Sequence, residues 1–279
     1  MCLLFLSFSS DTSQPYKLVL VFNRDELYSR PTTPAQFWDD DNILAGMDME
    51  TGKNGGTWLG ITRTGRIATL TNYRQKFSDL NPKAQGRGFL VVDYLHCDLP
   101  PEEYLKPLAE TRTHFNGYNI LTIELKSGKV FYFSNMEGRD IQQLTPGIYG
   151  LSNKTVDDPW AKVVHGKQRF IDVLQLYQDL KEALIEELLK MMSDDTCRHP
   201  GGNYPLLDWP EEYIKCSSSI FVRGFETPSG GYGTRTTSVI LVDNKDHVTY
   251  VERTLDDPIE IGTYRWRTQQ FEFDLLSSA

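Results

Sequence analysis

Two apolar runs near the N-terminus constrain the fold of this chain most strongly. Leu3–Phe8 and Lys17–Phe22 are continuous runs, without the alternation of apolar and polar residues that marks a sheet with one wet face. Continuous runs of this length are typical of strands that are covered on both faces. The polar stretch Ser9–Tyr16 connects them. We therefore predict a first hairpin whose strands are buried on both sides.

The rest of the chain repeats hairpins and helices in a fixed order. Two further hairpins and a late set of strands are expected from apolar runs flanked by turn residues, and helices are expected where apolar residues recur at helical spacing. The expected strands are Thr57–Thr62, Ile67–Asn72, Tyr118–Leu125, Lys129–Ser134, Ser217–Val222, Thr236–Val242, Val248–Arg253 and Tyr264–Phe273. The expected helices are Gly88–Cys97, one beginning at Asp158-Pro159, and Glu182–Met192. This order predicts an α+β fold in which two antiparallel sheets are stacked between helices.

Length and composition indicate a single domain. The chain has 279 residues, of which 39% are hydrophobic, which suffices for one large core or at most two small ones. We take residues 1–279 as one domain. The polar stretch 193–215 contains prolines and lacks periodicity, so we expect a lid or a flexible loop there.

Charge and cysteine usage exclude several classes of function. A net charge of −9 argues against nucleic acid as a partner. The four cysteines have no CxxC spacing, so they indicate reduced thiols of an intracellular protein and no zinc site, and the histidines show no metal-ligating spacing. No signal peptide and no apolar run long enough to cross a membrane is visible. The sequence does not set the oligomeric state.

Cys2 is the candidate for chemistry. Aminopeptidases remove an initiator methionine before a small residue, and the mature chain would then begin with a residue that carries a thiol and a free α-amino group. The thiol is a nucleophile and the amine is a base, so one residue would hold both groups that N-terminal nucleophilic catalysis needs.

The first hairpin predicts the neighbours of Cys2. If Phe8 pairs with Lys17, Cys2 lies opposite Asn23, and a slip of two residues moves its partner to Val21 or Asp25. In most registers the polar segment Asn23-Arg24-Asp25-Glu26 emerges close to the start of the chain. A cation near a thiol lowers its pKa, and a carboxylate near the amine holds that amine in place. The competing interpretation is that these polar residues simply end a strand.

Other polar residues stand at strand ends where they could complete a site. The second hairpin places Asn72 near Gly55 and Gly56, where an amide side chain beside exposed backbone N–H groups could form an oxyanion hole. An ordinary strand-end turn is the alternative there. Asn153 precedes the helix start at Asp158, and Arg235 begins a late strand.

The sequence resembles the NRDE family, also called the transport and Golgi organisation protein 2 family. The resemblance covers nearly the whole chain. It is carried by Met1-Cys2, Asn23-Arg24-Asp25-Glu26, Tyr28-Ser29-Arg30-Pro31, Gly55-Gly56-Thr57-Trp58, Leu70-Thr71-Asn72-Tyr73, Asn116-Gly117-Tyr118-Asn119, Gly150-Leu151-Ser152-Asn153 and Tyr232-Gly233-Thr234-Arg235-Thr236.

The resemblance implies a four-layer αββα sandwich similar to N-terminal-nucleophile hydrolases. It also implies roles in haem trafficking and in lipid or acyl-CoA metabolism, with Golgi or mitochondrial association of a cytoplasmic protein. A more distant similarity to bile-salt hydrolases and penicillin V acylases implies a catalytic set in the same order along the chain: Cys2, Arg24, Asp25, Asn72, Asn153 and Arg235.

Two functional interpretations follow. In the favoured one, a pocket around Cys2 and the NRDE segment binds an anionic amphiphile, such as haem or an acyl-CoA-like molecule, and haem is a transported ligand with no covalently bound cofactor. The ligand-binding candidates are Asn23, Arg24, Asp25, Glu26, Arg30, Gly55, Gly56 and Arg235. In the alternative, the protein is a cysteine hydrolase that cleaves an amide or a thioester, with Cys2 as nucleophile and Asn72 and Asn153 at the oxyanion.

Overall fold

The chain forms two compact units, each built from one antiparallel sheet and its helices. The computed structural model describes residues 2–38, 42–136, 140–158, 160–199 and 210–276. Unit 1 comprises residues 1–29, 146–152 and 156–273, and unit 2 comprises residues 30–145, 153–155 and 274–279. Unit 1 therefore takes its strands from both ends of the sequence, and unit 2 is largely one continuous insertion.

The sheet of unit 1 has seven strands and contains the N-terminus. Its order is β10-β1-β2-β12-β13-β14, and β11 pairs with β12. The bounds are β1 Leu3–Phe8, β2 Tyr16–Leu27, β10 Gly147–Leu151, β11 Phe225–Thr227, β12 Gly230–Asp243, β13 His247–Leu255 and β14 Trp266–Asp274. The central ladder is β2 against β12, so the N-terminal hairpin pairs with a strand more than 200 residues later in the sequence.

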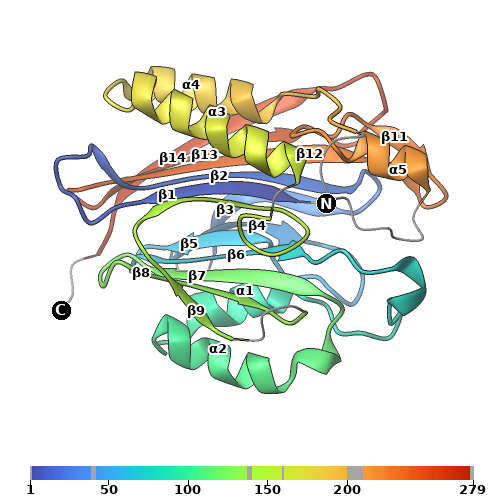
Figure 1. Ribbon diagram of the computed structural model, residues 1–279, viewed down its shortest axis with the longest axis horizontal. Coiled ribbons are helices and arrows are strands. Elements are labelled where there is room, and N and C mark those ends of the chain that lie inside the picture. Colours follow the sequence, from blue (N-terminus) through green and yellow to red (C-terminus); the bar gives the residue numbers. More distant parts are fainter. Residues whose placement is uncertain (1, 39–41, 137–139, 159, 200–209, 277–279) are drawn as a thin grey trace. The chain divides into compact units, whose positions relative to one another are not determined.

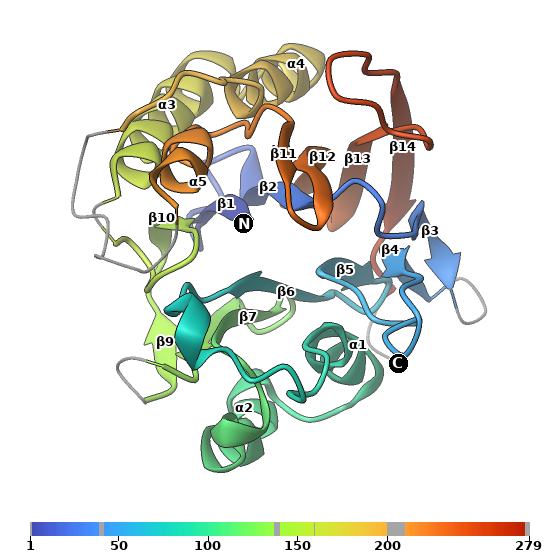
Figure 2. The same ribbon diagram turned by 90° about the vertical axis from the view of Figure 1, so that its right-hand side faces the viewer.

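Helices α3 (Ala161–Tyr177) and α4 (Lys181–Met192) cover one face of this sheet (Figure 1). Phe5 of β1 stacks on Phe170 of α3 with ring centroids 5.9 Å apart. A side chain on Gly166 of α3 would overlap the Phe5 ring, so this glycine permits the close approach of helix and strand. The short helix α5 (Glu211–Cys216) lies beside β11, where Tyr213 meets Phe225 edge-on (Figure 2).

Unit 2 has its own seven-stranded sheet in sequential order, β3 to β9. The strands are β3 Thr32–Trp38, β4 Ile43–Asp48, β5 Leu59–Thr62, β6 Arg66–Asn72, β7 Tyr118–Glu124, β8 Lys129–Ser134 and β9 Gln142–Leu144. Helix α1 (Gly88–His96) contacts β5 and β6, and α2 (Pro101–Glu110) contacts β7 and β8. The 3-10 turns are Phe77–Asp79 and Arg112–His114. One sheet layer and one helix layer in each unit supply the four layers that the family resemblance implies, and the predicted α+β class with two antiparallel sheets is confirmed.

Three expectations about individual elements need correction. Residues 217–222 do not form a strand, because the hydroxyls of Ser217, Ser218 and Ser219 bond to nearby backbone carbonyls and hold the chain in turns. The expected loop 193–215 includes α5, and its residues 200–209 lie outside the described part. Pro159 of the predicted helix start also lies outside it, and α3 begins at Ala161 with Trp160 as N-cap.

The first hairpin is shifted by one residue from the predicted register. Phe8 pairs with Leu18, not with Lys17, and Leu3 pairs with Asn23. The connection between the two strands is one residue longer than predicted, since Phe8 pairs with Leu18 and Ser9 N–H donates to the Lys17 carbonyl at 3.0 Å, and an Asx turn at Asp11 shapes the loop. A shift of one residue exchanges the faces of a strand, so Asn23 shares its face with Leu3 on the helix-covered side.

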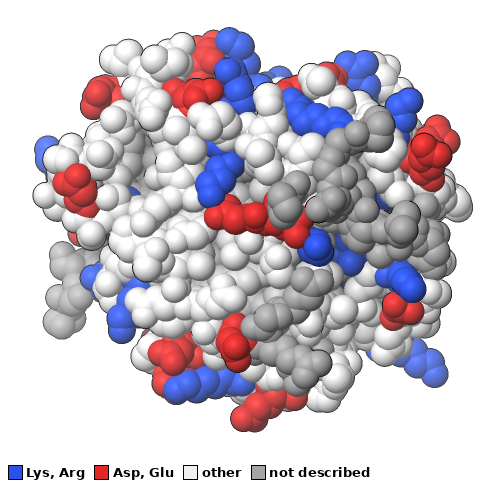
Figure 3. All heavy atoms as spheres, viewed as in Figure 1, with Lys and Arg blue, Asp and Glu red and all other residues white. Residues whose placement is uncertain are grey.

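Charged side chains of both signs are interspersed on the face of the molecule drawn in Figure 3. No helix among the described residues is long and apolar enough to cross a membrane.

Candidate functional site

The NRDE segment lies inside strand β2 and does not end it. Strand β2 continues to Leu27, and its residues from Asn23 to Leu27 pair with β12. Arg24 and Asp25 are each only 4% exposed, and Asn23 is fully buried. The interpretation that these polar residues simply end a strand is therefore wrong. Burying charged residues in a central strand costs free energy unless they are paired or hydrogen-bonded, so such a stretch indicates a specific role.

The side chain of Asn23 connects strand β2 by hydrogen bonds to the end of α4 and to the turns near residue 220. Its amide nitrogen donates to the carbonyls of Met192 and Ile220 at 2.8 and 3.0 Å. Its side-chain oxygen accepts a hydrogen bond from Thr237 Oγ1 at 2.7 Å. These three bonds use both N–H donors and give its oxygen a partner, so Asn23 acts as a structural anchor.

Asp25 is held in place from β12. Thr234 Oγ1 donates to Asp25 Oδ1 at 2.5 Å, and the Tyr232 hydroxyl donates to the Asp25 carbonyl at 3.1 Å. Burial raises the pKa of the Asp25 carboxyl, and the nearby charge of Lys162 opposes that rise. Asp25 is therefore easier to protonate than an exposed aspartate.

Lys162 is a buried residue of this site that sequence reasoning missed. It lies in the first turn of α3, is fully buried, and donates from Nζ to the Ser217 carbonyl at 3.1 Å. The structure exposes Val164 and buries Gly166 and Phe170, which lie on the same side of the helix as Lys162. Reading Gly166 as part of the buried stripe would have placed Lys162 on the inner face.

Cys2 is a buried thiol beside this segment. Burial raises the pKa of the thiol, Asp25 raises it further, and Arg24 lowers it. The Cys2 carbonyl accepts a hydrogen bond from Ser152 Oγ at 3.0 Å. The structure thus brings Cys2 together with Arg24 and Asp25, as the hairpin argument predicts, and burial favours the protonated form of the thiol.

Arg235 occupies a bulge in β12 next to Thr234. Its side chain is 2% exposed, and it donates from Nη1 to the Leu27 carbonyl at 3.2 Å. Its Nη2 lies 3.5 Å from Oδ1 of Asp257, which is exposed. A bulge changes the direction of a side chain relative to a regular strand, so this irregularity sets the direction of the Arg235 side chain. We call Cys2, Asn23, Arg24, Asp25, Lys162, Thr234 and Arg235 the N-terminal cluster.

Of the other predicted residues, Glu26 is a half-buried residue of β2, and Arg30, Gly55, Gly56, Asn72 and Asn153 belong to unit 2. Asn153 Nδ2 donates to the Asn72 carbonyl at 2.7 Å, and the Asn153 carbonyl accepts from Arg74 N–H at 2.7 Å. The two asparagines predicted at the oxyanion are therefore neighbours. Asn119 is also buried in unit 2 and donates to the Lys154 carbonyl at 2.7 Å.

Gly55 and Gly56 have structural reasons to be glycine. Gly55 has φ of +92°, and a Cβ on Gly56 would lie 3.2 Å from the Cα of Gly88, at the start of α1. The N–H groups of Gly55 and Gly56 donate to the carbonyls of Asp48 and Lys53. The expectation of exposed N–H groups here is wrong, because backbone acceptors already use both.

Arg30 forms a two-point ion pair with Asp48. Its Nε and Nη2 lie 3.1 and 2.6 Å from the two carboxylate oxygens. This paired geometry is specific and strong, and it gives the Arg30 guanidinium a carboxylate partner within unit 2. Among the described residues, no group of three or more His, Cys, Asp or Glu side chains is placed to hold a metal ion.

Comparison with known proteins gives one family over most of the chain. The family model described as Transport and Golgi organisation 2 matches residues 1–257. The chain is 39% identical over 284 residues to the Transport and Golgi organization protein 2 homolog of Homo sapiens, which covers 99% of this chain and 100% of that protein. The Transport and Golgi organization protein 2 of Drosophila melanogaster is 29% identical over 275 residues, 91% of this chain and 92% of that protein. Among solved structures, a variant of conjugated bile acid hydrolase from Clostridium perfringens aligns with a TM-score of 0.43 and 11% identity, over 100% of this chain and 99% of that chain.

Proposed function

Because the chain belongs to the Transport and Golgi organisation 2 family, we propose that it binds and carries an anionic amphiphile, such as haem or an acyl-CoA-like molecule, at the N-terminal cluster. The observation that supports this most is the burial of Arg24 and Arg235 on the adjacent strands β2 and β12. Guanidinium groups stay charged and bind carboxylates or phosphates through paired hydrogen bonds. Association with the Golgi and with mitochondria is part of the same proposal.

The state of the carboxyl group in the cluster supports anion binding. Burial raises the pKa of Asp25, so this residue can shed its negative charge at a lower cost than an exposed aspartate. A proton taken up by Asp25 would leave the cationic side chains Arg24, Lys162 and Arg235 to face an incoming anion. Binding of an anionic ligand is therefore expected to be tighter at mildly acidic pH.

Titration of the purified protein with haemin and with palmitoyl-CoA tests this proposal. Arg24→Met and Arg235→Met keep the apolar stems and remove the charge, and each should raise Kd about tenfold or more. Arg66→Met is the matched control, because Arg66 is a buried arginine of unit 2 that donates to the carbonyls of Tyr94 and Leu99. Thermal unfolding of every variant separates loss of the site from loss of the fold.

The proposal fails if the wild-type protein binds neither probe, or if Arg24→Met and Arg235→Met bind as well as Arg66→Met does. Cys2→Ala is a separate test of the thiol. If Cys2→Ala leaves the affinity for both probes unchanged, Cys2 has no part in binding.

Hydrolysis of an amide or a thioester is the second candidate, and the position of Cys2 beside Arg24 and Asp25 favours it. In this reaction the thiol sulfur attacks the carbonyl carbon, the α-amine of Cys2 takes the thiol proton and passes it to the leaving group, and water then releases the acid from the acyl-enzyme. Mass spectrometry of the mature N-terminus decides whether the amine exists. A retained Met1 or an acetylated amine removes the base and rules this reaction out.

A further inference from the structure

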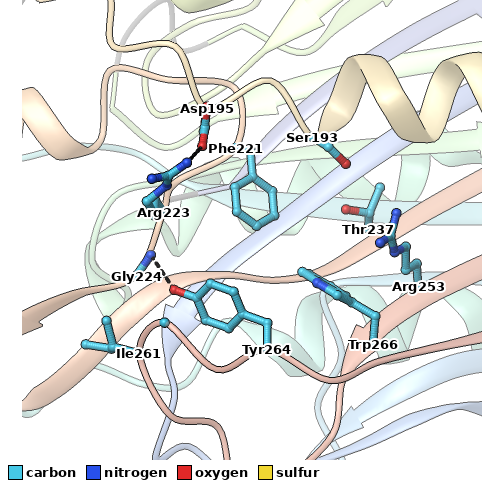
Figure 4. A pocket seen from close by; sticks show the side chains of 11 residues that line it. Ser193, Asp195, Phe221, Arg223, Gly224, Thr237, Arg253, Ile261, Tyr264 and Trp266 are labelled. Atoms are coloured by element: carbon cyan, nitrogen blue, oxygen red, sulfur yellow. Dashed lines mark hydrogen bonds and ion pairs between the residues drawn. The ribbon is translucent and has the colours of Figure 1, made fainter.

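Unit 1 contains a pocket, lined by aromatic and charged side chains, beneath the C-terminal end of α4 (Figure 4). Its volume is about 430 Å³, within the range of small-molecule sites. Its walls come from the segment after α4, the turns at 221–224, strands β12 and β13, and the segment that leads into β14. The lining residues are Ser193, Asp195, Phe221, Arg223, Gly224, Thr237, Arg253, Ile261, Gly262, Tyr264 and Trp266.

Three aromatic rings are held in fixed positions around this pocket. Phe221 and Trp266 pack against each other in a tilted arrangement, with ring centroids 5.9 Å apart and an interplanar angle of 56°. Tyr264 is fixed by its hydroxyl, which accepts a hydrogen bond from Gly224 N–H at 3.0 Å, and Tyr28 packs against it edge-on. All three rings are partly exposed, so they leave aromatic surface for a flat ligand.

Arg253 supplies a positive charge at the same place. Its guanidinium lies over the Trp266 ring, 5.1 Å from the ring centroid. Stacking on an aromatic ring orients a guanidinium and leaves its N–H edge available. Among the described residues, no carboxylate lies within ion-pair distance of Arg253, whereas Arg267 on the next strand is paired with Asp256. The donors of Arg253 are therefore available to a carboxylate or a phosphate.

The remaining polar groups of the pocket direct the ligand's anionic end toward Arg253. Thr237 pairs with Arg253 across the β12–β13 ladder. Its hydroxyl donates a hydrogen bond to Asn23, so toward the pocket this hydroxyl can act only as an acceptor. Arg223, 75% exposed, forms an ion pair with Asp195 at the rim. The two arginines exceed the one aspartate, so the lining carries a net positive charge.

From these contacts we propose that the pocket binds a small ligand with a planar aromatic ring and one anionic group, a carboxylate or a phosphate. The ring packs against the exposed surfaces of Phe221, Tyr264 and Trp266, and the anionic group bonds to Arg253. The site is separate from the N-terminal cluster, and the proposal does not depend on the function proposed above. Thr237 joins the two through its hydrogen bond to Asn23.

Two matched probes test the proposal on the full-length protein. Naphthalene-1-carboxylate and naphthalene-1-methanol share a fused ring and differ in charge. Calorimetric titration should show that the carboxylate binds about tenfold more tightly than the alcohol. Amide chemical-shift changes on titration should centre on Gly224 and Gly262, which lie in the lining.

The variants separate the roles of charge and ring. Arg253→Met should remove the preference for the carboxylate and leave binding of the alcohol unchanged, whereas Trp266→Leu should weaken both probes. Arg267→Met is the control, because Arg267 neighbours Trp266 on β14 and is absent from the lining. It should change neither affinity.

Three results would overturn the proposal: no binding of the carboxylate by the wild-type protein at millimolar concentration, equal affinity for both probes, or shift changes centred away from the pocket. If Arg253→Met fails to fold, Arg253→Lys serves in its place. Lysine keeps the charge but lacks the planar fork, so it should bind the carboxylate more weakly than the wild type and still prefer it over the alcohol.

Discussion

At the scale of single residues, the pKa values of the Cys2 and Cys197 thiols are shifted in opposite directions from the ordinary value of a cysteine. Burial raises the pKa of Cys2, while a hydrogen bond with Ser218, at 3.3 Å between the two side chains, lowers the pKa of the exposed Cys197. The thiolate is the form that reacts with alkylating agents. We expect iodoacetamide at pH 7 to modify Cys197 first and to leave Cys2 unmodified in the folded protein.

Peptide mapping over pH 6 to 9 checks this order. The rate at Cys197 should level off below the usual cysteine pKa of about 8.5. Cys197→Ser is the control that assigns the fast phase. If Cys2 reacts as fast as Cys197 at pH 7, the protein holds a thiolate at its N-terminus, and hydrolysis becomes the stronger functional candidate.

Asp25 makes stability depend on pH in a defined direction. Because burial raises its pKa in the folded state above the unfolded value of about 3.9, the folded protein binds the proton more tightly, and stability falls as pH rises from about 4 through the raised pKa. Asp25→Asn cannot ionise, and its side-chain oxygen can still accept the bond from Thr234. We expect this variant to match the wild type near pH 4 and to unfold at a higher temperature than the wild type near pH 8.

Thermal unfolding of the two proteins at pH 4, 6 and 8 measures this difference. Thr234→Val is the companion variant, since it removes the donor to Asp25 and should lower stability at each of these pH values. A larger loss of stability for Asp25→Asn at pH 8 than at pH 4 would show that attraction between Asp25 and Lys162 outweighs the cost of burying the charge.

At the scale of elements, the packing of α3 on β1 depends on one glycine. Replacing a helical glycine with alanine ordinarily stabilises a helix by about 1 kcal/mol. At Gly166 the added methyl group would overlap the Phe5 ring, so we expect Gly166→Ala to destabilise the protein by about 1–3 kcal/mol instead. Denaturant unfolding gives the value.

A double variant identifies the cause. Phe5→Leu is destabilising alone but makes room for the new methyl group, so Gly166→Ala should cost less in the Phe5→Leu background than in the wild type. Equal costs in the two backgrounds would mean that the glycine is required for another reason.

The elements also show what the sequence can predict and what it cannot. Apolar runs and helical spacing located α1, α4 and the first hairpin well, because these signals are local. The register of the hairpin was wrong by one residue, since it depends on a turn geometry that composition does not determine. The end of β2 was misplaced because its residues from Asn23 to Leu27 are paired by β12, which is distant in the sequence.

The candidate site was predicted in part for the same reason. The proximity of Cys2 to Arg24 and Asp25 follows from one hairpin and could be derived. The hydrogen bond from Thr234 to Asp25 joins residues 209 positions apart in the sequence, which no local pattern indicates. Lys162 was missed because the buried stripe of α3 that contains it runs through a glycine, Gly166. Local patterns therefore predicted that Cys2, Arg24 and Asp25 lie together, and the pairing of β2 with β12 determined the side chains that contact them.

At the scale of the whole molecule, this long-range pairing makes a prediction about truncated chains. Strand β12 lies between β2 and β13, so unit 1 has no continuous sheet until the chain has been made past residue 243. We expect a chain that ends at Ser229, and so lacks β12 to β14, to lose hydrogen-exchange protection at the amides of β1 and β2, because the paired strands that remain, β10, β1 and β2, leave the β12-facing edge of β2 and its buried polar residues without partners. A chain that ends at Asp274 keeps every strand and should retain this protection. If the β1–β2 amides stay protected in the shorter chain, the hairpin folds independently of β12, and the N-terminal cluster cannot owe its assembly to the β2–β12 ladder.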